Sequence, residues 1–437
     1  MMLCSRPILW TAYVATLLAC GGRQPTAVDQ SVAQGNLSSA LRHYEEQRLL
    51  HGPDVEALGQ VAGLVLEQEA SFPGSRRDAA IEELRRAGDE TDAVLMRLAA
   101  RSQSKAARAR ALAILTERGD ADAQQKLRRL LDDKDPEVVA AAIVALDPEA
   151  DQAKLLALLG SPFGPIRESA SRRLGQGPSQ RRVLKALIDT ARLDPLGSVR
   201  ASAIHALIKY KALAKPAFRQ GLKDSSPFVR HAAVIAAAQS GEHELDTLLM
   251  AELPDPPTEK SIDVAHALAR LAPSEKAKAI GRAYVLKGLE AGDPRVRYDA
   301  ATSLSTMASM EEQHGVIARA MQQETNIDTK VAMAGLLEKD ATYAPKARRV
   351  FEEALTTEGL GGVEAAMILA KTDAKAPSLQ TLERLMRTGT VEVRAAAAHA
   401  LAWDAGEPDR ARTALKAPHP RVRIKAAGGI LLALSGG

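Results

Sequence analysis

Apolar residues recur along most of the chain in a pattern that fits one face of a short helix. Residues 224–238 read D-S-S-P-F-V-R-H-A-A-V-I-A-A-A, and similar segments occur at 198–207, 293–304 and 393–401. When the residue before the arginine is counted as position zero, a small residue stands at position four and a large apolar residue usually stands at position eight. These three positions share one side of an α-helix, so each segment predicts a helix with a narrow buried stripe.

The same stripe can be followed through twelve units, whose spacing varies from 28 to 36 residues. Each interval holds two short helices and two turns, and amphipathic segments that suit the first helix occur at 122–131, 181–191, 275–289 and 379–386. Repetition at this period predicts an all-α solenoid in which each unit packs on its neighbours. The residues at position eight are Leu84, Leu115, Leu146, Leu174, Leu207, Ala237, Leu268, Leu304, Leu337, Leu369, Leu401 and Ile430.

The sequence also indicates where the second helix of each pair begins. An acidic or hydroxyl side chain precedes a proline at Asp135-Pro136, Ser226-Pro227 and Asp293-Pro294. Such a side chain caps a helix, and proline suits the first helical position because its missing N–H has no partner there. Composition agrees with closely packed helices, since 46% of residues are hydrophobic but only 3% are aromatic.

The pattern D-x-x-P-x-V-R-x-x-A-A-x-A-L, closest at 132–146, 224–238 and 293–304, resembles the HEAT repeat family. It is most similar to the short bacterial form found in phycobilisome lyases. The resemblance covers residues 71–437 and implies a right-handed α-α superhelix, an armadillo-like solenoid of about twelve helical pairs. It also implies that the exposed side of the second helices lines a concave surface.

The first residues have a different character. An apolar run at 8–19 is too short to span a bilayer but suits a signal peptide at 1–19. Leu17-Leu18-Ala19-Cys20 resembles the bacterial lipobox, which implies cleavage before Cys20 and lipidation of that residue. Residues 20–27 would then be a tether, and the absence of aspartate at Gly21 favours the outer membrane. We therefore expect a lipid-anchored protein of a bacterial envelope that faces the periplasm.

Both ends of the repeat array leave alternatives open. Residues 28–70 form either a helical cap or a partial tetratricopeptide-like unit, with a turn at 51–54. The apolar segment 428–434 comes last, without a polar capping helix after it. Either the final helix packs on the preceding unit alone, or it contacts a partner or a second copy.

The arginine at position one recurs in eight units. It could form a basic stripe for an anionic ligand, but we expect a structural ladder in which it pairs with acids such as Asp194 and Asp224, five residues before position zero. A formal net charge of +4 is small for a nucleic-acid binder of 437 residues, so no nucleic-acid partner is expected. The eight arginines are Arg77, Arg108, Arg167, Arg200, Arg230, Arg297, Arg394 and Arg423.

Positions two and six of the second helix lie opposite the buried stripe, where polar and histidine side chains gather. We name these residues the candidate ridge, which could be simple solvated surface or could bind a protein or peptide. The spacing of the histidines matches no metal motif, so neither a metal nor another cofactor is expected. The candidate ridge comprises Glu82, Glu168, Arg172, His205, His231, His266, Tyr298 and His399.

No catalytic constellation emerges from the sequence, so no enzymatic activity is expected. The leading hypothesis is a membrane-anchored scaffold for protein–protein interaction in the bacterial envelope. The alternatives are a cofactor-handling or lyase-like enzyme, by analogy of fold alone, and an assembly factor for outer-membrane or surface complexes.

Overall fold

The computed structural model describes residues 24–307 and 311–435. The expected signal peptide, Cys20 and the first half of the expected tether lie outside these residues. Within them the regular structure is entirely helical, which confirms the all-α prediction. The α-helices from α4 to α27 number twenty-four and form twelve successive pairs, so the prediction of about twelve units is also confirmed.

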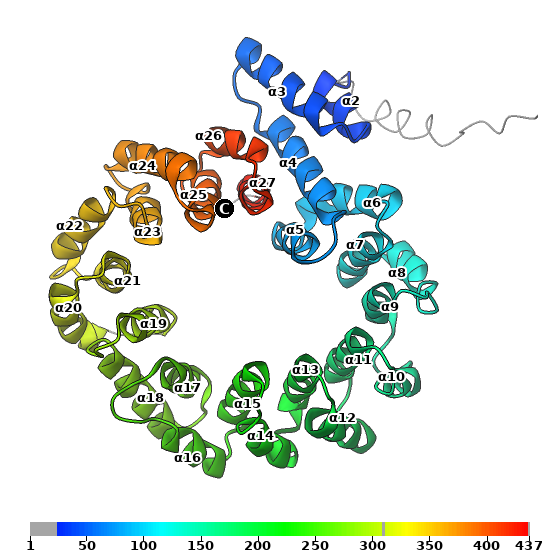
Figure 1. Cartoon of the computed structure of the whole chain (residues 1–437), viewed down its shortest axis with the longest axis vertical. Coiled ribbons are helices and arrows are strands. Elements are labelled where there is room, and N and C mark those ends of the chain that lie inside the picture. The colour runs from blue at the N-terminus through cyan, green and yellow to red at the C-terminus, as the bar shows by residue number, and fades with distance from the viewer. Residues whose placement is uncertain (1–23, 308–310, 436–437) are drawn as a thin grey trace, which may run out of the picture.

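The pairs are arranged in two layers, an inner and an outer one (Figure 1). The inner helices are α5 (Ser75–Arg86), α7 (Lys105–Glu117), α9 (Pro136–Ala142), α11 (Gly164–Gln176), α13 (Gly197–Leu207), α15 (Pro227–Ser240), α17 (Glu259–Leu271), α19 (Pro294–Ser305), α21 (Ile327–Leu337), α23 (Leu360–Leu369), α25 (Val391–Ala402) and α27 (Pro420–Leu434). Their pair partners are α4 (Val55–Ala70), α6 (Asp92–Arg101), α8 (Ala121–Arg128), α10 (Gln152–Leu158), α12 (Arg181–Leu193), α14 (Lys215–Gly221), α16 (His243–Ala251), α18 (Glu275–Gly288), α20 (His314–Gln323), α22 (Ala344–Ala354), α24 (Lys375–Thr388) and α26 (Pro408–Ala411).

Short 3-10 segments η1 to η5 join some of these helices. They are η1 (Gly88–Thr91), η2 (Ile143–Ala145), η3 (Ile208–Ala214), η4 (Glu311–Gln313) and η5 (Arg412–Lys416). Two further helices, α2 (Ala27–Ala33) and α3 (Leu37–His51), precede α4 and project from the rest of the molecule (Figure 1). Together with α4 they make up most of residues 28–70, the segment expected to form a helical cap or a tetratricopeptide-like unit, and the chain leaves the helical conformation at 52–54, within the expected turn.

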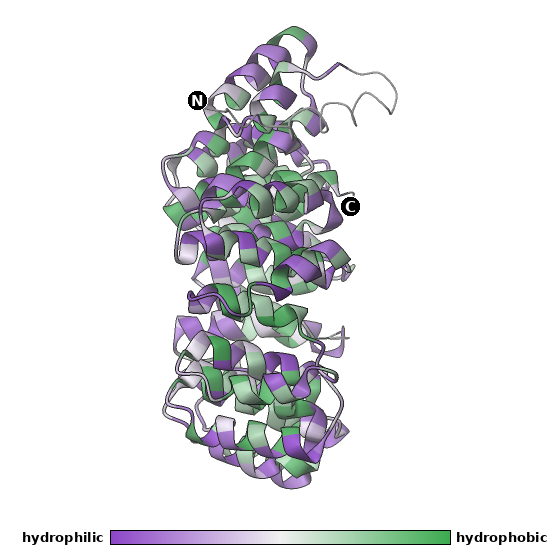
Figure 2. Ribbon diagram, turned by 90° about the vertical axis from the view of Figure 1, so that its right-hand side faces the viewer, coloured by the Kyte–Doolittle hydropathy of each residue, from purple (hydrophilic) through white to green (hydrophobic). Residues whose placement is uncertain are grey.

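The buried stripe explains how the inner helices pack. All twelve position-eight residues are buried, and the alanines at position four, such as Ala203 and Ala397, are completely covered. Because alanine is small, neighbouring inner helices approach closely along this stripe. The prolines at 136, 227 and 294 occupy the first turn as predicted, and Asp135 and Asp293 cap their helices through backbone N–H groups. Figure 2 shows the resulting mixture of hydrophobic and hydrophilic positions along the helices.

The array closes into a ring, because the last inner helix α27 packs on α4 and α5 at the start of the chain (Figure 1). A single buried apolar cluster joins the two ends, with Leu58 and Val65 of α4 in the same cluster as Ile424 and Leu431 of α27. We call this junction the seam. The expectation that α27 packs on the preceding unit alone is therefore wrong.

Two adjacent glycines show why α27 can pack on both sides. A Cβ at Gly429 would lie 2.9 Å from the carbonyl oxygen of His399 in α25. A Cβ at Gly428 would collide with the carboxylate of Glu83 in α5. The glycine pair thus allows two neighbouring inner helices to approach α27 from different directions.

Asp246 on α16 carries a buried carboxyl group that lacks a full set of hydrogen-bond partners. Its side chain is 3% exposed, and its Oδ1 accepts no hydrogen bond from the described part of the chain. Burial raises the pKa of this carboxyl above its ordinary value, which means that the ionised form destabilises the fold at neutral pH.

Replacing Asp246 by leucine should therefore stabilise the protein. We expect Asp246→Leu to raise the free energy of unfolding by about 1–3 kcal/mol at pH 7, with a smaller gain in acid, where the native carboxyl becomes protonated. Urea unfolding at pH 7 and pH 4 measures both effects. Asp263→Leu at an exposed position of α17 is the control and should change stability by less than about 0.5 kcal/mol. A loss of stability in Asp246→Leu would contradict this interpretation.

Candidate functional site

The arginines at position one form a ladder that links successive units. In six units the Nη1 atom donates to the carbonyl oxygen six residues earlier, as Arg200 does to Asp194 at 2.8 Å. Three of the arginines also pair with an acid of the next unit, and the pairs are Arg167–Asp194, Arg200–Asp224 and Arg297–Glu324. The predicted structural ladder is confirmed for Asp194 and Asp224.

The ladder also crosses the seam. Arg423 of the last unit donates from Nε and Nη2 to Oε1 of Glu69, at 2.9 and 2.6 Å. Glu69 lies on α4, is 4% exposed and also pairs with Arg76. Lys425 of α27 contacts Glu83 of α5 at 2.6 Å, and Asp409 accepts from both Tyr44 and Arg48 of α3. The seam therefore combines apolar packing with buried ion pairs.

Electrostatics give the ladder a definite pH dependence. The hydrogen bond from Arg200 lowers the pKa of Asp224, although burial acts in the opposite direction. Burial also opposes the shift at Asp194 and Glu324, but their arginine partners lower the pKa of both carboxyls. Because each folded pKa is below the unfolded one, this stabilisation is complete above the unfolded pKa near 4 and is lost as the pH falls further.

Asp224→Asn should reveal this dependence. We expect the substitution to lower the free energy of unfolding by about 2 kcal/mol at pH 7. The difference from the native protein should shrink below about pH 4 and vanish in strong acid, where the native carboxyl is also neutral. Urea unfolding across this range measures it, with the exposed Glu290→Gln as the control that should show no comparable change. A difference that grows in acid would contradict the ladder.

The inner helices carry all eight residues of the candidate ridge. Each inner helix packs on inner neighbours at its sides and on outer helices behind, so its exposed side belongs to the inner face of the ring (Figure 1). Four ridge residues are exposed and four are half-buried. The exposed ones are Glu82, Arg172, His205 and His231, and the half-buried ones are Glu168, His266, Tyr298 and His399.

The structure brings only part of the candidate ridge together. Arg172 and Glu168 form an ion pair at 2.7 Å within α11. Although the His205 side chain is exposed, partial desolvation by the surrounding protein, and then the charges of His231 and Arg172, lower its pKa, so these side chains of α11, α13 and α15 share one environment. His266 instead bonds through Nε2 to Oγ1 of Thr306 at 2.7 Å.

His399 lies in a different environment, near the seam. Burial lowers its pKa, and the nearby charges of Glu83 and Lys425 act in opposite directions. Tyr298 lies among acids, since burial and the charges of Glu364 and Asp328 raise its pKa. The residues of the candidate ridge thus fall in several separate local environments on the inner face and do not form one continuous cluster.

The sequence interpretation missed an acidic group on the inner face. Burial, followed by the charge of Asp328, raises the pKa of Glu364 on α23. Similarly, burial and nearby acids raise the pKa of Asp299 on α19. These residues belong to successive units whose inner helices pack side by side, so no motif within a single helix marks them.

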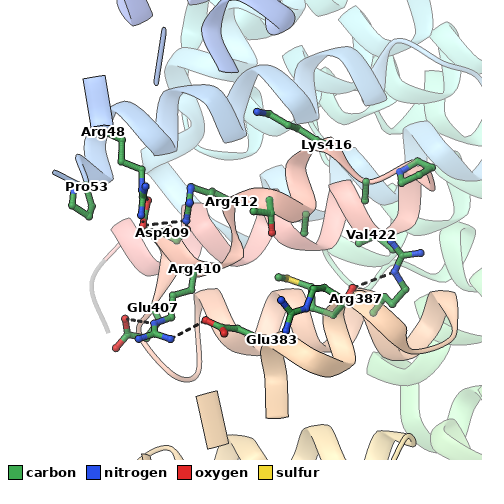
Figure 3. A pocket seen from close by; sticks show the side chains of 16 residues that line it. Arg48, Pro53, Glu383, Arg387, Glu407, Asp409, Arg410, Arg412, Lys416 and Val422 are labelled. Carbon is green, nitrogen blue, oxygen red and sulfur yellow. Dashed lines mark hydrogen bonds and ion pairs between the residues drawn. The ribbon is translucent and has the colours of Figure 1, made fainter. Parts of the chain in front are cut away.

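A cavity of about 880 Å³ lies at the seam, between α3 on one side and the segments α24 to α27 on the other (Figure 3). Arg410 bridges Glu383 and Glu407 at one wall, whereas Arg48 and Arg412 share Asp409 at the opposite wall. Arg387, Arg394, Lys416 and Ala417 also line it.

Across 24–307 and 311–435, histidine, cysteine and acidic side chains form no group of three or more that could hold a metal ion. In the same residues, no helix is both long enough and apolar enough to cross a membrane.

Comparison with known families identifies the repeats. Residues 93–153, from α6 to the start of α10, and 184–269, within α12–α17, match the family model for HEAT repeats. Over these two segments the chain is similar to HEAT repeats. Their helices fall in the two-layer arrangement described above, and a search of curated proteins finds no match.

Solved structures show similar helical architecture. The X-ray structure of YibA of E. coli is 21% identical, with 63% of this chain and 96% of that one covered and a TM-score of 0.37. Kap121p bound to RanGTP is 13% identical, with 90% and 49% covered and a TM-score of 0.31. Pds5 in its complex with Scc1 is 12% identical, with 97% and 83% covered and a TM-score of 0.28. At these identities the likeness concerns the fold alone.

Proposed function

We propose that this HEAT-repeat ring is a scaffold that binds a protein or peptide along its inner face and has no catalytic activity of its own. The observation that carries the proposal is the alignment of twelve inner helices, whose exposed sides form one continuous face around a closed ring (Figure 1). An extended partner could contact several units there, and HEAT units are suited to this because their surface is built from repeated, solvent-facing helix sides.

The chemistry of the inner face supports a polypeptide partner. Arg172, His205 and His231 combine cationic and imidazole groups on three neighbouring helices, whereas Tyr298, Asp328 and Glu364 form an acidic arc further round. A polypeptide can present charges of both signs at the corresponding spacings. Kap121p and Pds5 were each solved with a protein partner, RanGTP and Scc1 respectively, which is a property of those proteins and an analogy here.

Photocrosslinking tests this proposal. A photoreactive amino acid at positions 172, 231 and 266 should capture one and the same protein from cells, because these positions lie on three inner helices. The matched control is Lys185, an exposed residue of the outer helix α12, where that protein should not be captured. Equal capture at Lys185, or a different set of proteins at each inner position, would contradict the proposal.

We propose in addition that the ring is lipid-anchored through Cys20 in the periplasmic leaflet of a bacterial outer membrane. The support is the resemblance of residues 17–20 to a lipobox at the end of a short apolar run. Radiolabelled palmitate should be incorporated into the native protein and not into Cys20→Ser, which should also leave the membrane fraction. Equal labelling of both proteins would reject the anchor. Crosslinking and labelling can fail independently, so the two proposals are separable.

A further inference from the structure

In the ladder, Arg394 lacks the acid that the following unit would supply. In the regular units one acidic residue serves two arginines. Its carbonyl oxygen accepts from the arginine of its own unit, and its carboxylate pairs with the arginine of the preceding unit. Asp194 accepts from Arg200 and pairs with Arg167. In the last unit the carbonyl oxygen of Ala417 accepts from Arg423 in the same way, at 2.6 Å. Ala417 therefore stands where the acid that pairs with Arg394 would be expected.

Backbone geometry confirms that equivalence. Asp194 has φ −62° and ψ 133°, and Ala417 has φ −59° and ψ 142°. A side chain at position 417 therefore leaves the backbone in nearly the same direction as the carboxylate of Asp194. The alanine side chain has no carboxylate that could pair with Arg394.

In two other units the acid and the arginine are lost together. Ser161 and Ala291 stand in the acid's place, and both follow units in which the arginine is replaced, by Val139 and Ser261 respectively. Arg77 is retained although Ser102 stands in the acid's place, but Arg77 pairs with Glu137 instead. Arg394 is also retained, opposite Ala417, and has no such substitute acid among the described residues.

Arg394 is left with capacity to bind an anion. Its Nε donates to the carbonyl oxygen of Met386 at 3.2 Å, and within the described chain no carboxylate lies at ion-pair distance from Arg394 or from Arg387. Both arginines line the seam cavity, together with Ala417 (Figure 3). A guanidinium presents paired N–H donors that match the two oxygens of a carboxylate, which is how Arg167 holds Asp194 at 2.6 and 2.9 Å.

We propose that the seam cavity binds a ligand with at least two carboxylates. One carboxylate occupies the place of the missing acid against Arg394, and the second lies against Arg387. The cavity volume of about 880 Å³ suits a small carboxylic acid or a few residues of an acidic peptide. The proposal is independent of the binding of a partner on the inner face.

Ligand binding would also strengthen the ring. The cavity is lined by Arg48 of α3 as well as by residues of the last two units, so an occupant contacts both sides of the seam. A ligand that binds the closed form and not the unfolded chain stabilises the closed form in proportion to its saturation. The ring should therefore melt at a higher temperature when the cavity is occupied.

Calorimetric titration of the full chain tests the proposal, with citrate, hexaglutamate and inorganic phosphate as separate probes. We expect saturable binding of citrate or hexaglutamate. Binding of citrate would identify the ligand as a small free acid. Binding of hexaglutamate alone would identify it as an acidic polypeptide segment. Arg394→Gln should weaken that binding at least tenfold. Arg230→Gln, which changes a ladder arginine remote from the cavity, should leave the affinity unchanged.

Ala417→Asp provides a second, opposite test. It restores the missing acid, so it should remove carboxylate binding while raising the melting temperature of the ligand-free protein. A fall in melting temperature would overturn the equivalence of position 417 with position 194. The proposal is also overturned if neither carboxylate probe binds, if phosphate binds more tightly than both, or if Arg394→Gln and Ala417→Asp bind as the native protein does.

Discussion

Glu69→Ala should weaken the ring more than any other single change at its polar seam. The substitution removes a carboxylate that is 4% exposed and leaves Arg423 and Arg76 without it. Removing one partner of a buried ion pair leaves an uncompensated charge, so we expect the free energy of unfolding to fall by about 3 kcal/mol. Alanine favours helices, so the loss cannot come from the helix propensity of α4. Urea unfolding at pH 7 measures it.

Glu392→Ala is the matched control for that experiment. Glu392 pairs with Arg421 of α27 at 3.0 Å, but both side chains are more than half exposed. Water and salt screen such a pair, so its loss should cost less than about 1 kcal/mol. Equal costs for the two substitutions would show that the Glu69–Arg423 contact does not hold the ring closed.

Gly281→Ala should be the second large effect, because it concerns backbone atoms that cannot move aside. A Cβ at Gly281 in α18 would lie 2.5 Å from the carbonyl oxygen of Ala265 and 2.6 Å from the backbone nitrogen of Ala269, both in α17. Separating the two helices costs about 3 kcal/mol, and the better helix propensity of alanine returns about 1 kcal/mol. We expect a net loss of about 2 kcal/mol in urea unfolding.

Gly335→Ala tests the same chemistry without the clash. Gly335 lies inside α21, and apart from its chain neighbours and the backbone of its own helix no atom is within 4 Å of the position its Cβ would take. Alanine should therefore stabilise this helix, by up to about 1 kcal/mol. Opposite signs for the two glycine substitutions would support the close packing of α17 on α18, whereas a neutral Gly281→Ala would contradict it.

Much of the fold follows from local patterns. The positions of the buried stripe and the prolines require only the geometry of one helix, so the sequence could place the twelve inner helices. The acids Asp194 and Asp224 could be predicted as ladder partners because they stand at a fixed distance from the next helix. The exact ends of the outer helices were less predictable, since α8 ends at Arg128 and not at 131.

Ring closure could not be predicted in this way. It depends on the sum of small rotations between successive units, and its key ion pair joins residues that are 354 positions apart. The only local signal was the glycine pair at 428–429, which suggests close approach but does not identify the neighbouring helix. The grouping of Tyr298 with Asp328 and Glu364 was also missed, because it depends on contacts between the inner helices of successive units.

The distance between the ends of the array tests the central claim, a closed ring, most directly. Nitroxide labels can be placed at the exposed Glu56 of α4 and Arg421 of α27 in a Cys4→Ser, Cys20→Ser background, and diluted with unlabelled protein. Packed helices of this length should keep the labels within about 35 Å in a pulsed electron paramagnetic resonance measurement. A distance beyond about 80 Å, as in an open array of twelve units about 10 Å apart, would contradict the ring.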